Sequence, residues 1–370
     1  MCKYRPHTFI MRLVSTLDKG LDVLETLEAA GGAMSLAEIA TRTAIQRTAV
    51  FRLLSTLQQR GYVERLPNKK YRCTSRRRRF LVGYCAPLIG SPFREDVTAG
   101  LREAAARANV DLMVLDNPEE DAEQAAANAQ RLIDAKADLV ILFQPAEWVC
   151  HTVADCFFRA GVPAISVDAP VAGCVYFGGN NYQAGRLAGQ MLARFAREHW
   201  KGRFDKVVLL ESSLASTNVQ ARLGGVLVGL KETLKGVEEP HIVHLGTRAD
   251  QVTSREAMSA FLAKTRPGSK LLVAGFNDRA AVGAVLAARA AGREEDVAVV
   301  GQNATLEARE EIRRPDSRLI ASIAYFPERY GEKLIRLALA MISRERVPPA
   351  VYVDHMVLDH NNIDRIYARR

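Results

Sequence analysis

Polar and aromatic side chains follow the apolar segments in the second part of the chain, at the points where those segments end. They are two carboxylates, three amides, a hydroxyl, two guanidinium groups and two aromatic rings: Asp168, Asp278, Gln144, Asn277, Asn303, Ser91, Arg94, Arg222, Phe93 and Tyr325. A small ring with many hydroxyls needs donors and acceptors for each hydroxyl and a flat apolar surface for its C–H face. These residue types therefore predict a site for a small polyhydroxylated molecule.

The elements that must position these residues follow from the hydrophobic pattern. From residue 80 onward, short apolar runs alternate with helical stretches expected at 95–109, 122–136, 146–160, 183–198, 219–233, 253–264 and 280–291. This alternation is typical of βαβ units, so it predicts an α/β fold with doubly wound parallel sheets. About 290 residues exceed what one such core normally holds, which indicates two lobes.

The expected lobes exchange segments of chain. We assign 81–180 and 326–352 to lobe one, and 181–325 and 353–370 to lobe two. Ligands of open α/β sheets bind outside the carboxyl ends of the strands. Two facing lobes would bring those ends to a shared cleft, and the ten side chains above would line it.

The charge of the chain is concentrated at its start. Residues 1–82 hold 16 Lys and Arg against 6 Asp and Glu, a net charge of +10, whereas the remainder holds 35 against 36, a net charge of −1. This asymmetry indicates that the first part of the chain meets a polyanion and the second part does not.

Three short helices are expected in the basic part. The first ends at Gly31, and its apolar positions are Leu17, Leu21, Val23, Leu24 and Leu27. The second runs over 36–42, because Ser35 and Glu38 have the spacing of a capping box. The third lies within 46–61, and a hairpin follows with the tip 67–70.

A helix, a turn and a second helix with a polar leading end fit the major groove of DNA. We expect contacts to DNA from the start of the second helix, one end and face of the third helix, the hairpin tip and the linker that follows: Ser35, Gln46, Arg47, Thr48, Arg52, Asn68, Lys69, Lys70, Arg76 and Arg77. The alternatives are a solvated basic face and a winged helix that binds protein.

The segment LAEIATRTAIQRTAVFRLLSTLQQRGYVER and the basic hairpin after it resemble the N-terminal domain of IclR-type transcriptional regulators. The resemblance covers 17–74, and we place a winged helix-turn-helix domain at 1–74 and a basic linker at 75–80. Ala44 stands where these domains usually have glycine. A positive φ at this turn would strain Ala44 mildly.

The rest of the chain, 81–370, resembles the effector domain of the LacI/GalR family and the related periplasmic ribose-type sugar-binding proteins. The motifs are SPF, VPAISVDAP, GGNNYQAGRLAGQML, NVQARLGGVLVGL, VAGFNDRAAVGA, VAVVGQN and RLIASIAYFPERYGEKLI, in this order. The resemblance implies that Ser91 lines the cleft and that Phe93 stacks on the ligand. It further implies that Asp168 accepts from hydroxyls and that Arg222 spans two ligand oxygens.

The same resemblance implies that Asn277 binds a ligand hydroxyl and that Asp278 supports its own loop. It also implies that Asn303 and Tyr325 close the site. Ala169, Asn303, Tyr325 and Arg94 depart from the ribose-type pattern. Loss of a carboxylate at Asn303 and gain of a cation at Arg94 suggest an effector with a negative group. The alternative is that Arg94 points to solvent, as most arginines do.

Together these features predict a cytoplasmic transcriptional regulator, active as a homodimer or a dimer of dimers, whose affinity for operator DNA depends on a bound sugar, sugar acid or sugar phosphate. We expect no enzymatic activity or cofactor, since no GxGxxG follows a strand and neither GxxxxGK(S/T) nor GxSxG occurs. We expect no metal or membrane association, since the six cysteines form no CxxC pair and no apolar run reaches membrane-spanning length. The alternatives are an α/β metabolic enzyme that acts on a small polar substrate, and a sugar-binding protein without DNA activity.

Overall fold

The computed structural model describes residues 14–74, 79–88, 91–118, 120–212 and 217–368. The chain divides into two compact units, Met1–Arg79 and Phe80–Arg370, which we name the head and the body. The α/β class predicted from the sequence is confirmed in the body, and a helix-turn-helix with a hairpin forms the head.

The head consists of three helices and an antiparallel hairpin: α1 (Ser15–Ala30), α2 (Leu36–Thr43), α3 (Arg47–Gln59), β1 (Val63–Arg65) and β2 (Tyr71–Cys73). The expected capping box begins α2, since Ser35 Oγ accepts from the Glu38 amide and the Glu38 carboxylate accepts from the Ser35 amide. These hydrogen bonds satisfy two amides that the helix itself leaves open.

Two details of the head concern expectations from the sequence. Leu17 and Leu21 are 63% and 47% exposed, so they are not part of the core as the helical spacing suggested; only the second half of α1, with Val23 and Leu27, is covered by its neighbours. Ala44 adopts φ +52° in the turn before α3. The strain expected for a residue other than glycine is therefore present, at about 1 kcal/mol.

Lobe one of the body is a parallel six-stranded sheet with the strand order β13-β7-β6-β5-β3-β4. Its strands are β3 (Leu81–Ala86), β4 (Asp111–Asp116), β5 (Leu139–Leu142), β6 (Ala164–Val167), β7 (Val175–Gly179) and β13 (Ala350–Val353). Its helices are α4 (Pro92–Arg107), α5 (Ala122–Asp134), α6 (Glu147–Arg159) and α12 (Tyr330–Ile342).

Lobe two repeats this architecture with the strand order β14-β12-β11-β10-β8-β9, in which β14 alone is antiparallel. Its strands are β8 (Lys206–Ser212), β9 (Ile242–Thr247), β10 (Leu271–Gly275), β11 (Val297–Asn303), β12 (Leu319–Ala324) and β14 (Met356–Asp359). Its helices are α7 (Asn181–Trp200), α8 (Thr217–Lys231), α9 (Gln251–Lys264), α10 (Asp278–Ala290), α11 (Leu306–Ile312) and α13 (Ile363–Ile366). Short 3₁₀ turns lie at Glu239–His241, Glu294–Asp296 and Pro327–Arg329.

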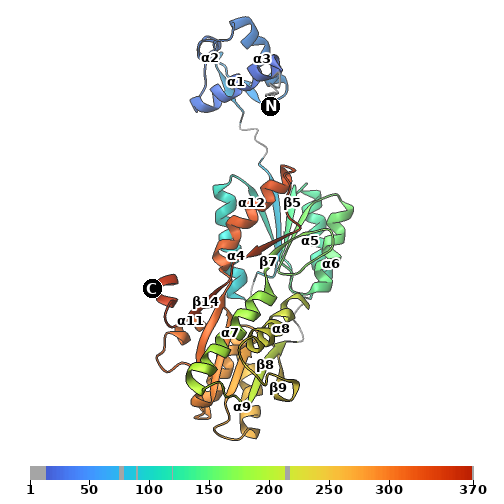
Figure 1. The fold of residues 1–370 in the computed structure, drawn as a ribbon. Coiled ribbons are helices and arrows are strands. Elements are labelled where there is room, and N and C mark those ends of the chain that lie inside the picture. The colour runs from blue at the N-terminus through green and yellow to red at the C-terminus, as the bar shows by residue number, and fades with distance from the viewer. Residues whose placement is uncertain (1–13, 75–78, 89–90, 119, 213–216, 369–370) are drawn as a thin grey trace, which may run out of the picture. The chain divides into compact units, whose positions relative to one another are not determined.

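Both sheets are covered on both faces, as Figure 1 shows. In lobe one, Tyr84 of β3 points into the cluster that contains α4 and α12, whereas the next residue, Cys85, points into the cluster of α5 and α6. In lobe two, Leu209 of β8 faces α7 and α8, and Leu210 faces α9 and α10. This alternation explains why the strands are almost continuous apolar runs in the sequence.

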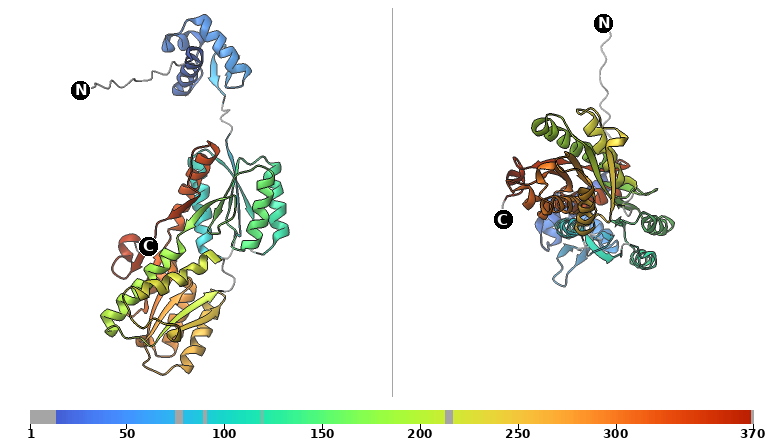
Figure 2. Two further views of the ribbon diagram at one scale, coloured as in Figure 1. Left: turned by 45° about the vertical axis from the view of Figure 1, so that its right-hand side comes forward. Right: turned by 90° about the horizontal axis from the view of Figure 1, so that it is seen from below.

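The chain crosses between the lobes after β7, after β12 and between β13 and β14. We call these three crossings the hinge. The C-terminal helix α13 lies beside the junction of the lobes (Figure 2), where the Tyr367 hydroxyl donates to the Glu328 carboxylate at 3.0 Å. The hinge thereby holds the carboxyl ends of the two sheets near each other.

Helices α7 and α8 pack backbone against backbone through four glycines. A Cβ on Gly185 would lie 1.8 Å from the Arg222 carbonyl oxygen, and one on Gly225 would lie 2.2 Å from the Tyr182 carbonyl oxygen. Gly189 and Gly229 are equally close to the opposite helix. This contact fixes the start of α8, from which Arg222 extends.

The expected helices agree with the structure to within a few residues. The largest shift is at α4, which begins at Pro92 rather than at residue 95, because proline fits the first turn of a helix. Elements α11, α12, α13, β13 and β14 were not expected. Four of them are short, and their sequences carry little periodicity, whereas the longer α12 buries Leu334 and Ala338 at helical spacing. Among the described residues, no helix is long and apolar enough to cross a bilayer.

Candidate functional site

The predicted DNA face of α3 is exposed. Gln46, Arg47 and Thr48 are exposed at the leading end of α3, and Arg52 is exposed on the side of the helix opposite the core residues Val50 and Leu54. Neither Arg47 nor Arg52 forms an ion pair with a carboxylate among the residues that the structure describes. Their guanidinium groups can therefore hydrogen-bond base edges or phosphates.

The other predicted DNA contacts differ in availability. Lys69 is exposed and Lys70 half-buried at the hairpin tip, where Lys69 adopts φ +60°. Asn68 Oδ1 accepts from the Lys70 amide and shapes this turn, and the hydroxyl of Ser35 is occupied by the cap of α2. Arg76 and Arg77 lie outside the described residues.

Phe51 is a further residue of this face that the sequence did not single out. Its ring is 48% exposed, and it lies one helical turn after Arg47 and one turn before Ser55. An exposed aromatic ring in the middle of a basic face can contact a thymine methyl or a sugar. The signal in the sequence was its position, out of phase with the core residues Val50 and Leu54.

Nine of the ten predicted effector residues line one cavity in the cleft of the body, with a volume of about 420 Å³. They are Ser91, Phe93, Arg94, Gln144, Asp168, Arg222, Asn277, Asp278 and Asn303. They follow β3, β5, β6, β10 and β11, except that Arg222 lies in α8. The volume is at the small end of ligand pockets, which suits a single-ring molecule.

Lobe one contributes an aromatic wall and an aspartate. Phe93 lies edge-on to Phe143 at a centroid distance of 6.3 Å, and both rings border the cavity. Asp168 Oδ1 accepts from the Gly179 amide at 3.1 Å, and burial raises the pKa of this carboxyl above its usual value. Asp168 adopts φ +58°, and such unusual backbone geometry is enriched at binding sites.

Lobe two contributes a buried guanidinium. Arg222 is 8% exposed; its Nε donates to Asn181 Oδ1 at 2.6 Å, and its Nη1 donates to the Phe276 carbonyl at 3.2 Å. The guanidinium also lies 4.8 Å from the centroid of the Tyr325 ring. These contacts hold a positive charge at the edge of the cavity.

Asn277 and Asp278 are both tied into the backbone of lobe two. Asn277 caps α10 by accepting from the Ala280 amide at 2.9 Å, and its Nδ2 donates to the Ala249 carbonyl at 2.9 Å. Its amide therefore holds two loops together, and because Asn277 also lines the cavity, the hydroxyl contact expected from the sequence stays a prediction. Asp278 accepts from Ser322 Oγ and the Thr305 amide, each at 2.6 Å, so it supports its loop.

Tyr325 is the predicted residue that does not line the cavity. It is 1% exposed at the hinge, where its hydroxyl lies 3.2 Å from Gln302 Oε1 and 3.4 Å from Asn181 Oδ1. The chain leaves β12 at this point and turns toward lobe one, and the turn directs the ring under Arg222 rather than into the cleft.

Several cavity residues were missed by the sequence reasoning. They are Phe143, Ser212, Arg248, Arg279 and Thr305. Arg248 directly follows β9, which was recognised as a strand but was not included among the strand ends, and Arg279 follows Asp278. Asn218 of α8 also spans the cleft, since its Nδ2 donates to the Asp168 carbonyl at 3.3 Å.

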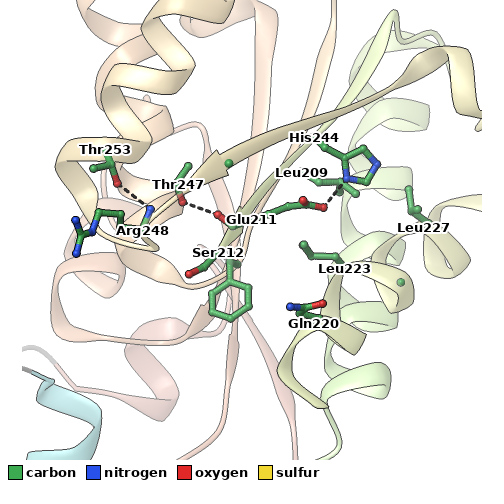
Figure 3. A pocket seen from close by; sticks show the side chains of 13 residues that line it. Leu209, Glu211, Ser212, Gln220, Leu223, Leu227, His244, Thr247, Arg248 and Thr253 are labelled. Carbon is green, nitrogen blue, oxygen red and sulfur yellow. Dashed lines mark hydrogen bonds and ion pairs between the residues drawn. The ribbon is translucent and has the colours of Figure 1, made fainter. Parts of the chain in front are cut away.

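Two larger hollows adjoin this cavity. One of about 660 Å³ lies between α8 and the strands β8 and β9, contains the Glu211 and His244 ion pair, and shares Arg248 with the cleft cavity (Figure 3). The other, of about 800 Å³, lies beside α11 and the C-terminal residues. The first is lined by lobe two alone, and the second shares Phe93 and Asn303 with the cleft cavity but includes none of Gln144, Asp168, Arg222 and Asn277.

The cysteines of the described residues, Cys73, Cys85, Cys150, Cys156 and Cys174, are free thiols. Burial raises the pKa of Cys85 and Cys150 to about 12, so both are protonated at neutral pH. Within the described part of the chain, no group of three or more His, Cys, Asp or Glu side chains could hold a metal ion.

The fold and the cavity define a two-lobed binding protein that carries a helix-turn-helix head. The chain belongs to the periplasmic binding protein domain family, whose model matches residues 82–346. The model of the IclR helix-turn-helix domain matches residues 16–67. Both resemblances inferred from the sequence are confirmed.

Curated relatives match the body at low identity. The D-ribose/D-allose-binding protein of Pseudomonas aeruginosa is 28% identical over 193 residues, which are 50% of this chain and 56% of that protein. The ribose import binding protein RbsB of Escherichia coli is 25% identical over 270 residues, which are 72% of this chain and 86% of that protein.

Solved structures share the fold. A periplasmic solute binding protein from Actinobacillus succinogenes with bound D-allose aligns with a TM-score of 0.66 and 21% identity, and covers 78% of this chain and 100% of that chain. A solute binding protein from Bacillus halodurans with bound myo-inositol aligns with a TM-score of 0.67 and 19% identity, and covers 80% and 99%.

Proposed function

We propose that this protein is a transcriptional regulator whose affinity for operator DNA is set by a small sugar or sugar-derived effector bound in the cleft of the body. The proposal rests on one observation above all. Nine residues chosen from the sequence as ligand contacts line a single cavity, and the same chain carries an IclR helix-turn-helix domain with an exposed basic face.

The residues of the cavity support a polyhydroxylated ligand. Phe93 and Phe143 offer an apolar wall, and Asp168, Arg222 and Gln144 offer acceptors and donors around it. The relatives and solved neighbours named above carry ribose, D-allose or myo-inositol in their names or titles. From these observations we infer that the effector of this chain is a small carbohydrate.

The hinge supports a switch between two states. A ligand that contacts both lobes stabilises the closed arrangement of the body by its differential affinity for that arrangement. The chain crosses the junction three times, so closure moves lobe one relative to lobe two. In a dimer, this movement changes the separation of two heads on paired half-sites, which couples sugar and operator.

The experiment combines DNA and ligand binding on the full chain. Genomic fragments that the protein retains are selected first, and gel shifts then measure the affinity for the selected operator with and without sugars. Operator binding that changes on addition of a sugar supports the proposal. Turnover of a sugar would support the enzyme alternative instead. Sugar binding without any affinity for DNA would support a sugar-binding protein that does not act on DNA.

Two matched variants assign the DNA contact. Arg47→Gln removes a cation from the exposed leading end of α3, and we expect a loss of operator affinity of about 10-fold. Arg60→Gln removes the same charge from the other end of α3, and we expect near wild-type affinity. Equal losses in both variants would mean that only the net charge of the head matters.

The oligomeric state is tested separately. A homodimer or a dimer of dimers would place two heads on a pseudo-palindromic operator. Light scattering of the purified chain, free and bound to the selected operator, measures this directly. A monomer under both conditions would contradict the coupling through paired heads.

A further inference from the structure

Positively charged side chains outnumber negatively charged ones around the cleft cavity. Four arginines line it, Arg94, Arg222, Arg248 and Arg279, against two aspartates, Asp168 and Asp278. A neutral polyol does not require such an excess of positive charge. The excess is also distributed unevenly, because three of the arginines belong to lobe two.

Burial reduces the negative charge of both aspartates, because it favours the protonated carboxyl. Burial raises the pKa of Asp278 to about 7 despite its hydrogen bonds from Ser322 and Thr305, so this carboxyl is partly protonated at neutral pH. Burial also raises the pKa of Asp168. The negative charge that faces the arginines is therefore reduced further.

The arginines of lobe two keep their charge available to a ligand. The hydrogen-bond acceptors of Arg222 are a neutral amide and a neutral carbonyl. Arg248 and Arg279 are exposed at the rim, and neither forms an ion pair among the residues that the structure describes. In Figure 3, the Arg248 side chain extends away from Glu211, which is paired with His244.

Asp250, an acidic neighbour of this rim, has another partner. The Asp250 carboxylate accepts from the Thr253 amide at 2.8 Å and caps α9, and this hydrogen bond is the main reason that its pKa is lowered. Arg279 makes only a minor contribution to that pKa. The guanidinium group of Arg279 is thus not neutralised by Asp250.

We propose that the effector is an anionic sugar derivative, and that Arg248 and Arg279 at the rim of lobe two, with Arg222 beneath them, bind its carboxylate or phosphate group. Arginine forks match the geometry of both oxyanions. Lobe one then holds the sugar ring against Phe93 and Phe143. This inference rests on the proposed function of the cleft cavity as the effector site. It extends the sequence-based hypothesis of an effector with a negative group, which rested on Asn303 and Arg94, to the arginines of lobe two.

Calorimetry on the full chain tests the proposal with matched probes. Ribose is compared with ribonate and ribose 5-phosphate, and allose and glucose are compared with their onic acids, uronic acids and 6-phosphates. We expect at least one anionic sugar to bind about 10-fold more tightly, or better, than its neutral parent sugar. The comparison of acid with phosphate identifies which oxyanion the site takes.

Single charge removals locate the subsite. Arg248→Gln and Arg279→Gln should each weaken the anionic probe by about 10-fold and leave the neutral parent nearly unchanged. Arg197→Gln is the matched control, because it removes the same charge from an exposed position near the end of α7, remote from the hinge at which α7 begins. The control should retain the wild-type affinity for both probes.

The outcomes separate this inference from the proposed function. Neutral sugars that bind as tightly as their acids and phosphates would overturn the anionic effector and leave the sugar-responsive regulator intact. If the Arg248→Gln and Arg279→Gln variants bind the anionic sugar as tightly as the wild type, the assigned subsite is wrong. If neither class of sugar binds, the proposed function of the cleft fails, and this inference fails with it.

Discussion

The two lobes of the body are each built on a six-stranded sheet, parallel except for β14 of lobe two, yet they present different chemistry to the cleft. Lobe one presents the rings of Phe93 and Phe143 and a single cation, Arg94, whereas lobe two presents Arg222, Arg248 and Arg279. The difference arises in the loops after the strands and in the first turns of the helices, because the sheets and the buried faces of the helices are built from the same apolar pattern. It teaches that the fold supplies the cleft and that the residues after each strand select the ligand.

The lobes also differ in the packing that supports these loops. In lobe two, α7 and α8 meet through four glycines, and this contact fixes the helix that carries Arg222. In lobe one, α4 and α12 meet at the glycine pair Gly100 and Gly331. Lobe two therefore depends more strongly on the absence of side chains at its helix interface.

The largest expected effect is the loss of the buried cation of lobe two. Arg222→Gln removes the guanidinium and leaves the Phe276 carbonyl without its donor, so we expect effector affinity to fall about 100-fold. Calorimetry with the selected sugar measures the loss, and gel shifts without sugar should show unchanged operator affinity. Retained effector affinity would mean that lobe two does not provide the central contact.

The second prediction concerns the helix interface of lobe two. Gly225→Ala places a methyl group against the Tyr182 carbonyl, so we expect the free energy of unfolding to fall by about 3 kcal/mol. The adjacent Gly224 has no atom within 4 Å of an added Cβ, and Gly224→Ala should stabilise α8 by about 0.5–1 kcal/mol. Denaturant unfolding of both variants is decisive, since similar results would contradict the close approach of α7 and α8.

The third prediction tests the aromatic wall of lobe one. Phe93→Leu keeps an apolar side chain but removes the flat ring, so we expect neutral and anionic sugars to bind about 3- to 10-fold more weakly, and by the same factor. Calorimetry with a matched sugar pair measures this ratio. A loss confined to the anionic sugar would mean that the division between the lobes is wrong.

The smallest expected effect is a dependence of sugar acid binding on pH. Because the pKa of Asp278 is about 7, this carboxyl gains a proton as the pH falls from 8 to 6, and the cleft becomes more positive. The affinity for a sugar acid should then rise a few-fold toward pH 6, by roughly the change expected for one partly titrating group. Isothermal titrations at pH 6, 7 and 8 measure it.

Asp278 lines the cavity, and its pKa lies in that range. The charged and titratable neighbours that contribute to its pKa, or to which it contributes, are Arg222, which stays protonated, and Tyr325, whose pKa is raised to about 12. His355 at the hinge has a pKa lowered to about 4. Asp278→Asn should therefore abolish the pH dependence, and a dependence that persists in this variant would assign it to another group.

The sequence predicted most of the cleft because strand ends are a local property. Asp168 and Gln144 were found from their position directly after apolar runs, and both lie in the cavity. Arg248 and Arg279 were missed although the same rule covers them, since Arg248 follows β9 and Arg279 follows the strand end of β10. Tyr325 also follows a strand, but the chain turns at the hinge, and the side chain becomes buried.

The sequence by itself determined most of the elements, the two lobes and the division between a basic head and a near-neutral body, because hydrophobic periodicity, caps and charge are readable over short windows. Only the tertiary structure decided which side chains share the cavity. It showed that the Asn277 amide is engaged in a cap, that Leu17 is exposed, and that the cations gather on lobe two. These facts depend on contacts between segments distant in the chain, and no local pattern encodes the direction of a side chain at such a contact.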